Sequence, residues 1–279
     1  MGRLIDNARV TKVRVTEDAV ATDTRADRLA AEEPLQLRVD GTDLTTTMRT
    51  PGHDIELVHG LLHAEGVITS AQDVVTARYC AGAVGPDNAN TYNTLDVSLV
   101  PRPDPYIPIR NVTTNSACGV CGTTSIDDLM KTSRYTLRPV HPTARQVVAM
   151  PRRLSEGQQA FRKTGGIHAA GAFTADGRPL VIREDVGRHN AADKVIGALL
   201  LADRLPGETG GEDAPVYLAM SSRASFELVQ KAVLAGFSGL IAVSAATSLA
   251  VNTAREAGLL LTGFTRDDRF NLYSGELDT

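Results

Sequence analysis

The chain has 279 residues, 42% of them hydrophobic and 22% charged, which is typical of a folded globular protein with one large domain or two smaller ones. The 29 lysines and arginines and 33 aspartates and glutamates leave a net charge of −4, which argues against a nucleic-acid-binding surface. The 4% aromatic content, without any tryptophan, argues against a surface on which bases stack.

Neither a targeting signal nor a membrane span is predicted. Residues 1–15 carry charges throughout and no apolar core, unlike a secretory signal peptide. The uncharged stretch between Lys231 and Arg255 contains glycine, serine, threonine and asparagine, which predicts a helix end, a strand and a helix start. We therefore expect a cytoplasmic protein, in which three cysteines point to thiol chemistry or a metal site and not to a disulfide framework.

The N-terminal part of the chain predicts mostly strands. Residues 1–33 are rich in small and charged side chains, so we predict a mobile N-terminal segment. Asp40-Gly41 is a hairpin signal between two strand-like stretches. We predict a strand-rich domain over 34–110, with strands at 34–39, 42–49, 77–80 and 91–100, a helix at 54–64 and a proline-punctuated linker at 101–108.

The C-terminal part, residues 139–279, predicts an α/β domain, so that the whole chain is α+β. We expect a helix over 143–161, with a break near Pro151, and a helix that begins at an Asn190 N-cap. Short apolar strands then alternate with helices, which predicts parallel strands joined by right-handed crossovers. The remaining predicted strands are 170–173, 180–184, 216–220, 240–244 and 259–262, and the helices 190–205, 224–235 and 249–257.

Two cysteines stand close together in Asn115-Ser-Ala-Cys118-Gly-Val-Cys121-Gly122, within a predicted cysteine loop and short helix over 111–138. A capping-box spacing predicts a helix start near Ile126, whose dipole would favour a thiolate just ahead of it. Two such thiols can relay a sulfur atom, close a disulfide or hold half a zinc site. Glycine after each cysteine favours a flexible loop.

Zinc and redox alternatives stay open at this point. A structural zinc site would need Cys80 and a histidine to complete the ligand set, since the chain has no second Cys-x-x-Cys. A thioredoxin-like pair would need a strand directly before it, where this chain has a proline-punctuated stretch. His63-Ala64-Glu65 imitates part of the zinc deaminase signature, but Ala117 stands where that signature requires proline. We expect no metal ligand among His53, His59 and His63.

Several predicted turns carry groups suited to anions. The turn 183–190 joins a strand to a helix and is crowded with charged side chains, which fits either a ligand site or a surface salt-bridge cluster. Ser221-Ser222-Arg223 has the form of a phosphate cradle, and the turn at 245–248 is its neighbour in the next unit. Both helix N-termini should open at one edge of the sheet, where together they could hold a diphosphate.

These segments together resemble the formate dehydrogenase accessory sulfurtransferases, which are sulfur carrier proteins for the molybdenum cofactor. The resemblance extends from about Pro34 to Tyr273. Its most specific motifs are NSACGVCG (115–122), TGGIHAAG (164–171), REDVGRHNAADKVIG (183–197), SSRASFELVQKAV (221–233) and GFTRDDRFNLY (263–273). Ser222 stands where glycine is expected, and Ala117 where small polar residues are common.

The resemblance implies a sulfurtransferase that accepts persulfide sulfur from a cysteine desulfurase and delivers it to the bis-molybdopterin guanine dinucleotide cofactor for formate dehydrogenase. It also implies a C-terminal domain similar to cytidine deaminases without their zinc, a homodimer, and a site that a guanine nucleotide can occupy. Cys118 would carry the sulfur with help from Cys121. The candidate cofactor contacts are Phe264, Thr265, Arg266, Asp267, Asp268, Arg269, Arg223, Ser222, Arg188, His189 and His168.

Two other functions are alternatives to this one. The chain could be a cofactor- or dehydrogenase-binding chaperone whose Cys-x-x-Cys senses a metal or the redox state, which persistent bound zinc would favour. It could also be a deaminase-like hydrolase, which the spacing of its motifs disfavours. No structural metal, membrane or nucleic acid is expected for the sulfur carrier.

Overall fold

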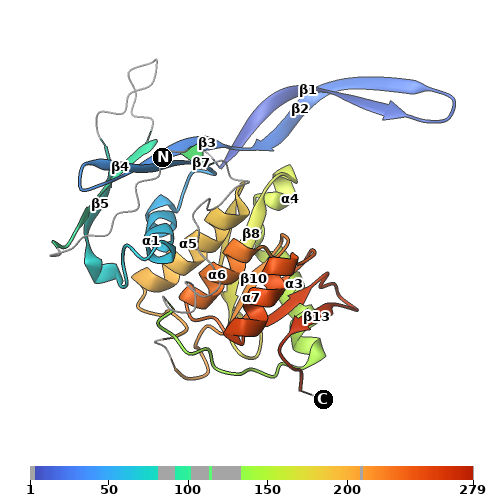
Figure 1. Ribbon diagram of the computed structural model, residues 1–279. Coiled ribbons are helices and arrows are strands. Elements are labelled where there is room, and N and C mark those ends of the chain that lie inside the picture. Colours follow the sequence, from blue (N-terminus) through green and yellow to red (C-terminus); the bar gives the residue numbers. More distant parts are fainter. Residues whose placement is uncertain (1–3, 81–91, 102–112, 115–132, 208–209, 279) are drawn as a thin grey trace.

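The computed structural model describes residues 4–80, 92–101, 113, 114, 133–207 and 210–278. A strand-rich N-terminal part lies beside a larger body in which helices cover a central sheet, and a long two-stranded arm projects from their junction (Figure 1). The mixed α and β architecture predicted from the sequence is confirmed. Among the described residues, no helix is long and apolar enough to cross a membrane.

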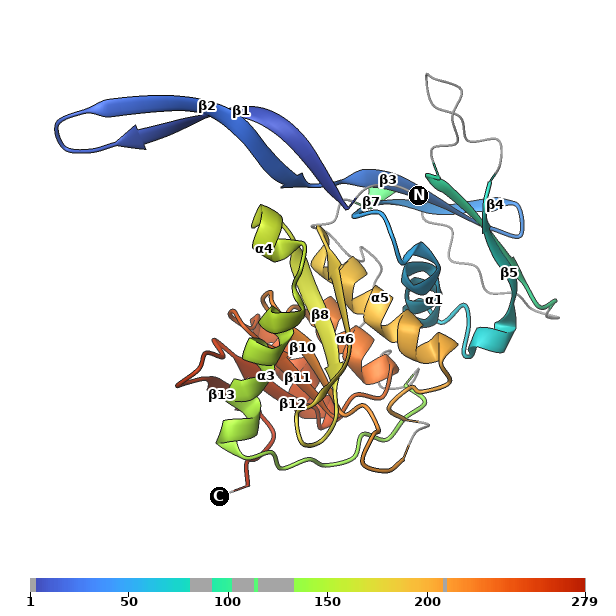
Figure 2. The same cartoon turned by 180° about the vertical axis from the view of Figure 1, so that it is seen from behind.

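The projecting arm is an antiparallel hairpin of β1 (Ile5–Val15) and β2 (Val20–Ala30). The sequence predicted a mobile segment over 1–33 and did not predict these strands. Almost all of their side chains are exposed, so neither strand has the alternation of apolar and polar residues by which a strand is recognised. Figure 2 shows from behind that the arm stands away from the rest of the molecule.

The N-terminal sheet has the strand order β5-β6-β3-β4-β7. β3 (Glu33–Val39) and β4 (Thr42–Arg49) form the predicted hairpin, in which Asp40 and Gly41 have φ of 47° and 79°, as a tight turn of this kind requires. The helix α1 (Asp54–Ala64) has the predicted bounds. The other elements are η1 (Ala71–Asp73), β5 (Val74–Tyr79), β6 (Thr94–Leu99) and β7 (Thr113–Thr114).

The C-terminal sheet has the order β13-β12-β11-β10-β8-β9. β10 (Tyr217–Met220), β11 (Gly239–Ala242) and β12 (Leu260–Gly263) are parallel, as predicted. The other three strands are β8 (His168–Phe173), β9 (Pro179–Asp185) and β13 (Asn271–Ser274). β8 runs antiparallel to both β10 and β9, and β13 runs antiparallel to β12, so the sheet is mixed.

Helices cover both faces of this sheet. α5 (Arg188–Leu201), α6 (Phe226–Leu234) and α7 (Ser248–Ala257) lie on one face, and α3 (Ala144–Gly157) lies on the other (Figures 1 and 2). The alternation within β10 shows why: Leu218 and Met220 belong to the core under α5 to α7, while Tyr217 and Ala219 belong to the core under α3. The C-terminal part therefore has three layers, with the sheet between two layers of helices.

Two helix boundaries differ from the predictions. α3 continues through Pro151, because one proline removes one helix hydrogen bond while Val147, Met150 and Leu154 pack on the sheet on both sides of it. The chain instead breaks after Gly157, before the short helix α4 (Phe161–Thr164). The predicted N-cap at Asn190 is wrong as well, since α5 begins at Arg188 with Gly187 as its N-cap.

Two glycines allow α1 and α5 to cross at very short range. A Cβ atom on Gly60 would lie 1.9 Å from the carbonyl oxygen of Asp193, and one on Gly197 would lie 1.8 Å from that of Glu56. Each glycine therefore faces the backbone of the other helix. Because α1 belongs to the N-terminal part and α5 to the C-terminal part, this crossing joins the two parts through a shared apolar core.

A buried ion pair also joins the two parts. The Lys194 Nζ lies 2.7 Å from Asp185 Oδ2 and donates to the Thr50 carbonyl at 2.8 Å. The same carboxylate oxygen accepts from the Thr50 N–H at 3.1 Å, and Oδ1 accepts from Gly187 N–H at 2.8 Å and Asn190 Nδ2 at 3.2 Å. Burial raises the pKa of Asp185, and the Lys194 ammonium opposes that shift. Both charges are thus held by short bonds to the segment after β4.

We expect Gly60→Ala to destabilise the protein by about 2 kcal/mol or more, because the new methyl group overlaps the α5 backbone. At a helix position without such a neighbour, replacing glycine by alanine stabilises the helix by about 1 kcal/mol. The close crossing and the helix propensity therefore predict opposite signs for the change in unfolding free energy. Urea unfolding measures the difference. Gly210→Ala is the matched control, since nothing lies within 4 Å of the position its Cβ would take. Equal stability of Gly60→Ala and wild type would contradict the close crossing.

We expect Lys194→Met to cost about 3–5 kcal/mol of unfolding free energy, since it leaves the Asp185 charge buried without its ammonium. Adding Asp185→Asn should restore part of that loss, because the neutral amide removes the buried charge. Arg178→Met, which breaks the exposed pair with Asp213, is the control and should cost less than about 1 kcal/mol. An equal loss of unfolding free energy in Lys194→Met and Arg178→Met would show that the buried ion pair contributes no more to stability than the exposed one.

Candidate functional site

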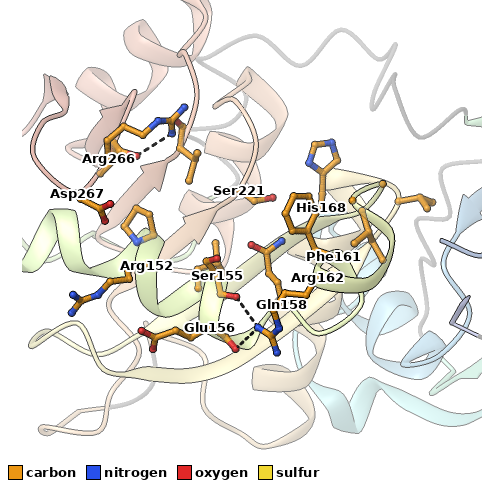
Figure 3. A pocket seen from close by; sticks show the side chains of 18 residues that line it. Arg152, Ser155, Glu156, Gln158, Phe161, Arg162, His168, Ser221, Arg266 and Asp267 are labelled. Atoms are coloured by element: carbon orange, nitrogen blue, oxygen red, sulfur yellow. Dashed lines mark hydrogen bonds between the residues drawn. The ribbon is translucent and has the colours of Figure 1, made fainter. Parts of the chain in front are cut away.

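A cavity of about 880 Å³ opens where the parallel strands of the C-terminal sheet end (Figure 3). One wall comes from the end of α3, from α4 and from the glycine loop that follows. The other wall comes from the turns after β10, β11 and β12, which contribute Ser221, Val243 and residues 265–267. Carboxyl ends of parallel strands are where open α/β sheets bind ligands. The cavity is therefore the candidate site.

Glu184 positions the wall that carries α4. Its two carboxylate oxygens accept hydrogen bonds from the N–H groups of Ala160 and Phe161, each at 2.8 Å. These N–H groups stand at the start of α4, where a helix has donors without intrahelical partners. At the other end of α4, Gly165 has φ of 69° and turns the chain into the loop that leads to His168. Glu184, which belongs to the predicted turn at 183–190, thus supports the α4 wall of the cavity without lining the cavity itself.

The loop after β12 brings three of its six predicted contacts to the cavity. Thr265, Arg266 and Asp267 line it, whereas Phe264, Asp268 and Arg269 are exposed side chains outside the lining. Arg266 Nη1 donates to the Val243 carbonyl at 2.6 Å, which ties this loop to the turn after β11. The buried Thr265 hydroxyl lies 3.1 Å from that of Thr262. The lining part of the loop is therefore held in place.

The turn after β10 contributes Ser221 and not its neighbours. The Ser221 hydroxyl accepts from the Ala169 N–H at 2.8 Å. Ser222 is buried and donates to the Arg223 carbonyl, and the Arg223 side chain is exposed. Neither residue lines the cavity. The turns that begin α6 and α7 do lie together, as predicted, because the Ala224 N–H donates to the Ala245 carbonyl at 2.9 Å.

His168 is the predicted histidine that lines the cavity. Burial lowers its pKa, and the charge of Arg188 lowers it further while Asp185 opposes the shift, so the imidazole is neutral near pH 7. Arg188 and His189 themselves do not belong to the lining. The His189 Nε2 instead lies 3.5 Å from the Ser225 hydroxyl and 3.9 Å from a Glu227 carboxylate oxygen, toward α6.

Cys118 and Cys121 lie outside the described residues, as does the helix start predicted near Ile126. Cys80 follows β5 and is half-buried. Within the part of the chain that the structure describes, no three His, Cys, Asp or Glu side chains gather as a metal site would require. His59 donates from Nδ1 to the Ile55 carbonyl at 2.7 Å, and burial lowers the pKa of His63 to about 4, with Arg134 and Lys231 adding to the shift.

The sequence did not predict the wall formed by α3 and α4. Arg152, Gln158 and Arg162 line the cavity from this side. Arg162 Nη1 donates to the carbonyls of Ser155 and Glu156 at 3.2 and 2.8 Å, so this arginine caps the end of α3. These residues lie on polar positions of an amphipathic helix and in a loop, where nothing in the sequence distinguishes them from a solvated surface.

The charges of the cavity lie mainly on one side. Figure 3 shows Arg152, Arg266 and Asp267 there, and Gln158, Ser221 and His168 toward the other side. Arg162 lies beside Gln158, and its Nη1 is already bonded to the carbonyls of Ser155 and Glu156. Arg152 makes no hydrogen bond or ion pair with any described residue, so its guanidinium is available to a ligand. An elongated ligand with an anionic group at one end and a polar uncharged group at the other fits this arrangement.

Comparison with known proteins agrees with the motifs. Residues 30–278 match the model of the FdhD/NarQ family. The sulfur carrier protein FdhD of Corynebacterium efficiens is 58% identical over 99% of this chain and 100% of its own length. The protein of that name in Mycobacterium tuberculosis is 47% identical over 90% of this chain and 91% of its own.

A crystal structure of a formate dehydrogenase accessory protein from Desulfotalea psychrophila shares the fold. Its TM-score is 0.71 at 19% identity, over 96% of this chain and 97% of that one. The family model and the relatives each cover most of the chain, and the structural likeness extends over both of its parts. The chain belongs to the FdhD/NarQ family.

Proposed function

We propose that this chain is a sulfur carrier that supports formate dehydrogenase by sulfurating its molybdenum cofactor. The observation that carries the proposal is the match to the FdhD/NarQ family over residues 30–278, together with close relatives named sulfur carrier proteins. A cysteine desulfurase supplies the sulfur as a persulfide, and the cargo is the bis-molybdopterin guanine dinucleotide cofactor. The chain works in the cytoplasm as a homodimer, with formate dehydrogenase as the final recipient.

The cavity supports the cargo part of the proposal. Its volume of about 880 Å³ lies within the ~300–1,000 Å³ of small-molecule sites, enough for a nucleotide portion of a larger cofactor. Arg152 and Arg266 suit phosphate groups, since guanidinium groups bind phosphate oxygens through charge-assisted hydrogen bonds. Ser221 and Val243, from the turns after β10 and β11, complete this wall of the cavity.

The two cysteines carry the chemistry. The Cys118 thiolate attacks the outer sulfur of the donor persulfide; a sulfur–sulfur bond forms on Cys118 and the donor cysteine leaves as a thiolate. In delivery, the Cys121 thiolate attacks the inner sulfur of this persulfide. A Cys118–Cys121 disulfide forms, and the outer sulfur leaves as sulfide with the electron pair of the broken bond and passes to the cargo. A thiol reductant then restores both cysteines.

The carrier step is tested by intact mass and peptide mapping after incubation with a cysteine desulfurase and cysteine. We expect a gain of one sulfur atom, removed by cyanide, on Cys118. Cys118→Ala should lose it and fail to support formate dehydrogenase, because no thiolate remains to accept the sulfur. Cys80→Ala is the matched control and should keep the gain. No gain on the wild type, with zinc retained through purification, would favour the binding chaperone instead.

The cavity is tested by calorimetry with GDP as a probe. We expect Arg152→Ala to weaken binding by about 1.5–3 kcal/mol, roughly 10- to 150-fold in Kd, since a charge-assisted hydrogen bond to phosphate is lost. Arg266→Ala should weaken binding as well, and it also frees the loop from the Val243 carbonyl. Arg145→Ala is the control, an exposed arginine on the same helix outside the lining. Unchanged affinity in Arg152→Ala and Arg266→Ala would reject this cavity as the phosphate site.

A further inference from the structure

Gln158 is a buried amide at the inner side of the cavity. It stands at the C-cap of α3, where the helix ends and the chain turns toward α4. Only 6% of the residue is exposed, yet its side chain belongs to the cavity lining. Figure 3 shows the amide pointing into the pocket. Glutamine is rarely buried to this extent unless its amide is hydrogen-bonded.

The amide has no partner within the described residues, and this sets it apart from the other buried polar groups of the lining. The Thr265 hydroxyl is hydrogen-bonded to Thr262. The hydroxyl of Ser221 accepts from the Ala169 N–H, which leaves its own O–H to donate. The amide is not among the fully enclosed side-chain atoms without a partner in the described residues, so it reaches the cavity space and can meet a ligand there. The amide of Gln158 therefore points to a ligand that is bound there.

A carboxamide presents an acceptor and a donor side by side. The edge of guanine that carries O6 and N1–H presents the complementary pair. The charged side of the cavity, with Arg152 and Arg266, suits the phosphates of the same molecule. We propose that Gln158 hydrogen-bonds the base of the cargo nucleotide through this edge, as a specificity-determining residue. The inference rests on the proposed function, since it takes the cavity to hold the nucleotide portion of the cofactor.

Two probes that differ only in the base isolate this contact: GMP and ribose 5-phosphate. We expect Gln158→Leu to weaken GMP binding about tenfold, as loss of a paired hydrogen-bond contact does, and to leave ribose 5-phosphate binding unchanged. Gln159→Leu is the matched control, because it makes the same change at the exposed neighbouring position outside the lining. It should leave the binding of both probes unchanged. Calorimetry measures all three proteins.

Two further measurements separate base recognition from a structural role. The thermal unfolding midpoint of Gln158→Leu should stay close to that of the wild type, because the amide makes no hydrogen bond within the described residues that the change would remove. Gln158→Glu presents two acceptors, which match the N1–H and amino donors of guanine but only one donor of adenine. Its preference for GMP over AMP should therefore be larger than that of the wild type.

The outcomes distinguish this inference from the proposed function. If the wild type binds neither GMP nor ribose 5-phosphate, the cavity is not the nucleotide site and both proposals fail. If the wild type binds both probes and Gln158→Leu binds GMP with unchanged affinity, the base contact alone is overturned. Equal weakening of both probes in Gln158→Leu also overturns it, since the change would then act on the cavity and not on the base.

Discussion

The buried pair of Asp185 and Lys194 is the interaction on which the arrangement of the two parts depends. Two opposite charges that leave water are stable only when every remaining donor and acceptor finds a partner. Here those partners are Thr50 in the N-terminal part and Gly187 and Asn190 in the C-terminal part. The ion pair is therefore complete only when the two parts are docked. The crossing of α1 and α5 at Gly60 and Gly197 depends on the same docking.

This constraint explains why several charged groups of the motif at 183–194 have their partners within the protein. The position of the motif between a strand and a helix, at the carboxyl edge of a sheet, is where α/β proteins commonly bind anions. Here Thr50 lies at that position, and its hydroxyl accepts from the Val186 N–H at 3.1 Å. Arg183 pairs with Glu56 on α1, with Nη2 2.7 Å from Oε1. Although burial opposes it, the hydrogen bonds from Arg183 and His53 lower the pKa of Glu56 to about 2. The motif contributes Val186 to the cavity lining, and Glu184 supports the wall that carries α4.

The sequence predicts those elements that bury one face and fails where burial is absent or is settled by tertiary contacts. The hairpin of β3 and β4, the helix α1 and the parallel strands β10 to β12 follow from apolar spacing and turn residues. The exposed arm has no apolar face to recognise. In the site, the resemblance to a known family predicts Thr265, Arg266 and Asp267, since the residues alone fit a salt-bridged tail as well. Gln158 was not predicted, because a polar residue at a helix end has the same pattern whether it faces solvent or a cavity.

The walls of the cavity are held by bonds within the protein, so little ordering is left for a ligand to induce. Glu184 fixes the start of α4, Arg162 closes the end of α3, and Arg266 ties two turns together. A site whose groups are already positioned loses less entropy when it binds. Gln158 differs from these residues, because its place is fixed by packing while its amide makes no hydrogen bond within the described residues and opens into the cavity. A ligand that matches both its donor and its acceptor would replace water there, and a ligand that leaves one of them unpaired would bind more weakly. The packing that places Gln158 thus favours one pattern of hydrogen-bonding groups over another.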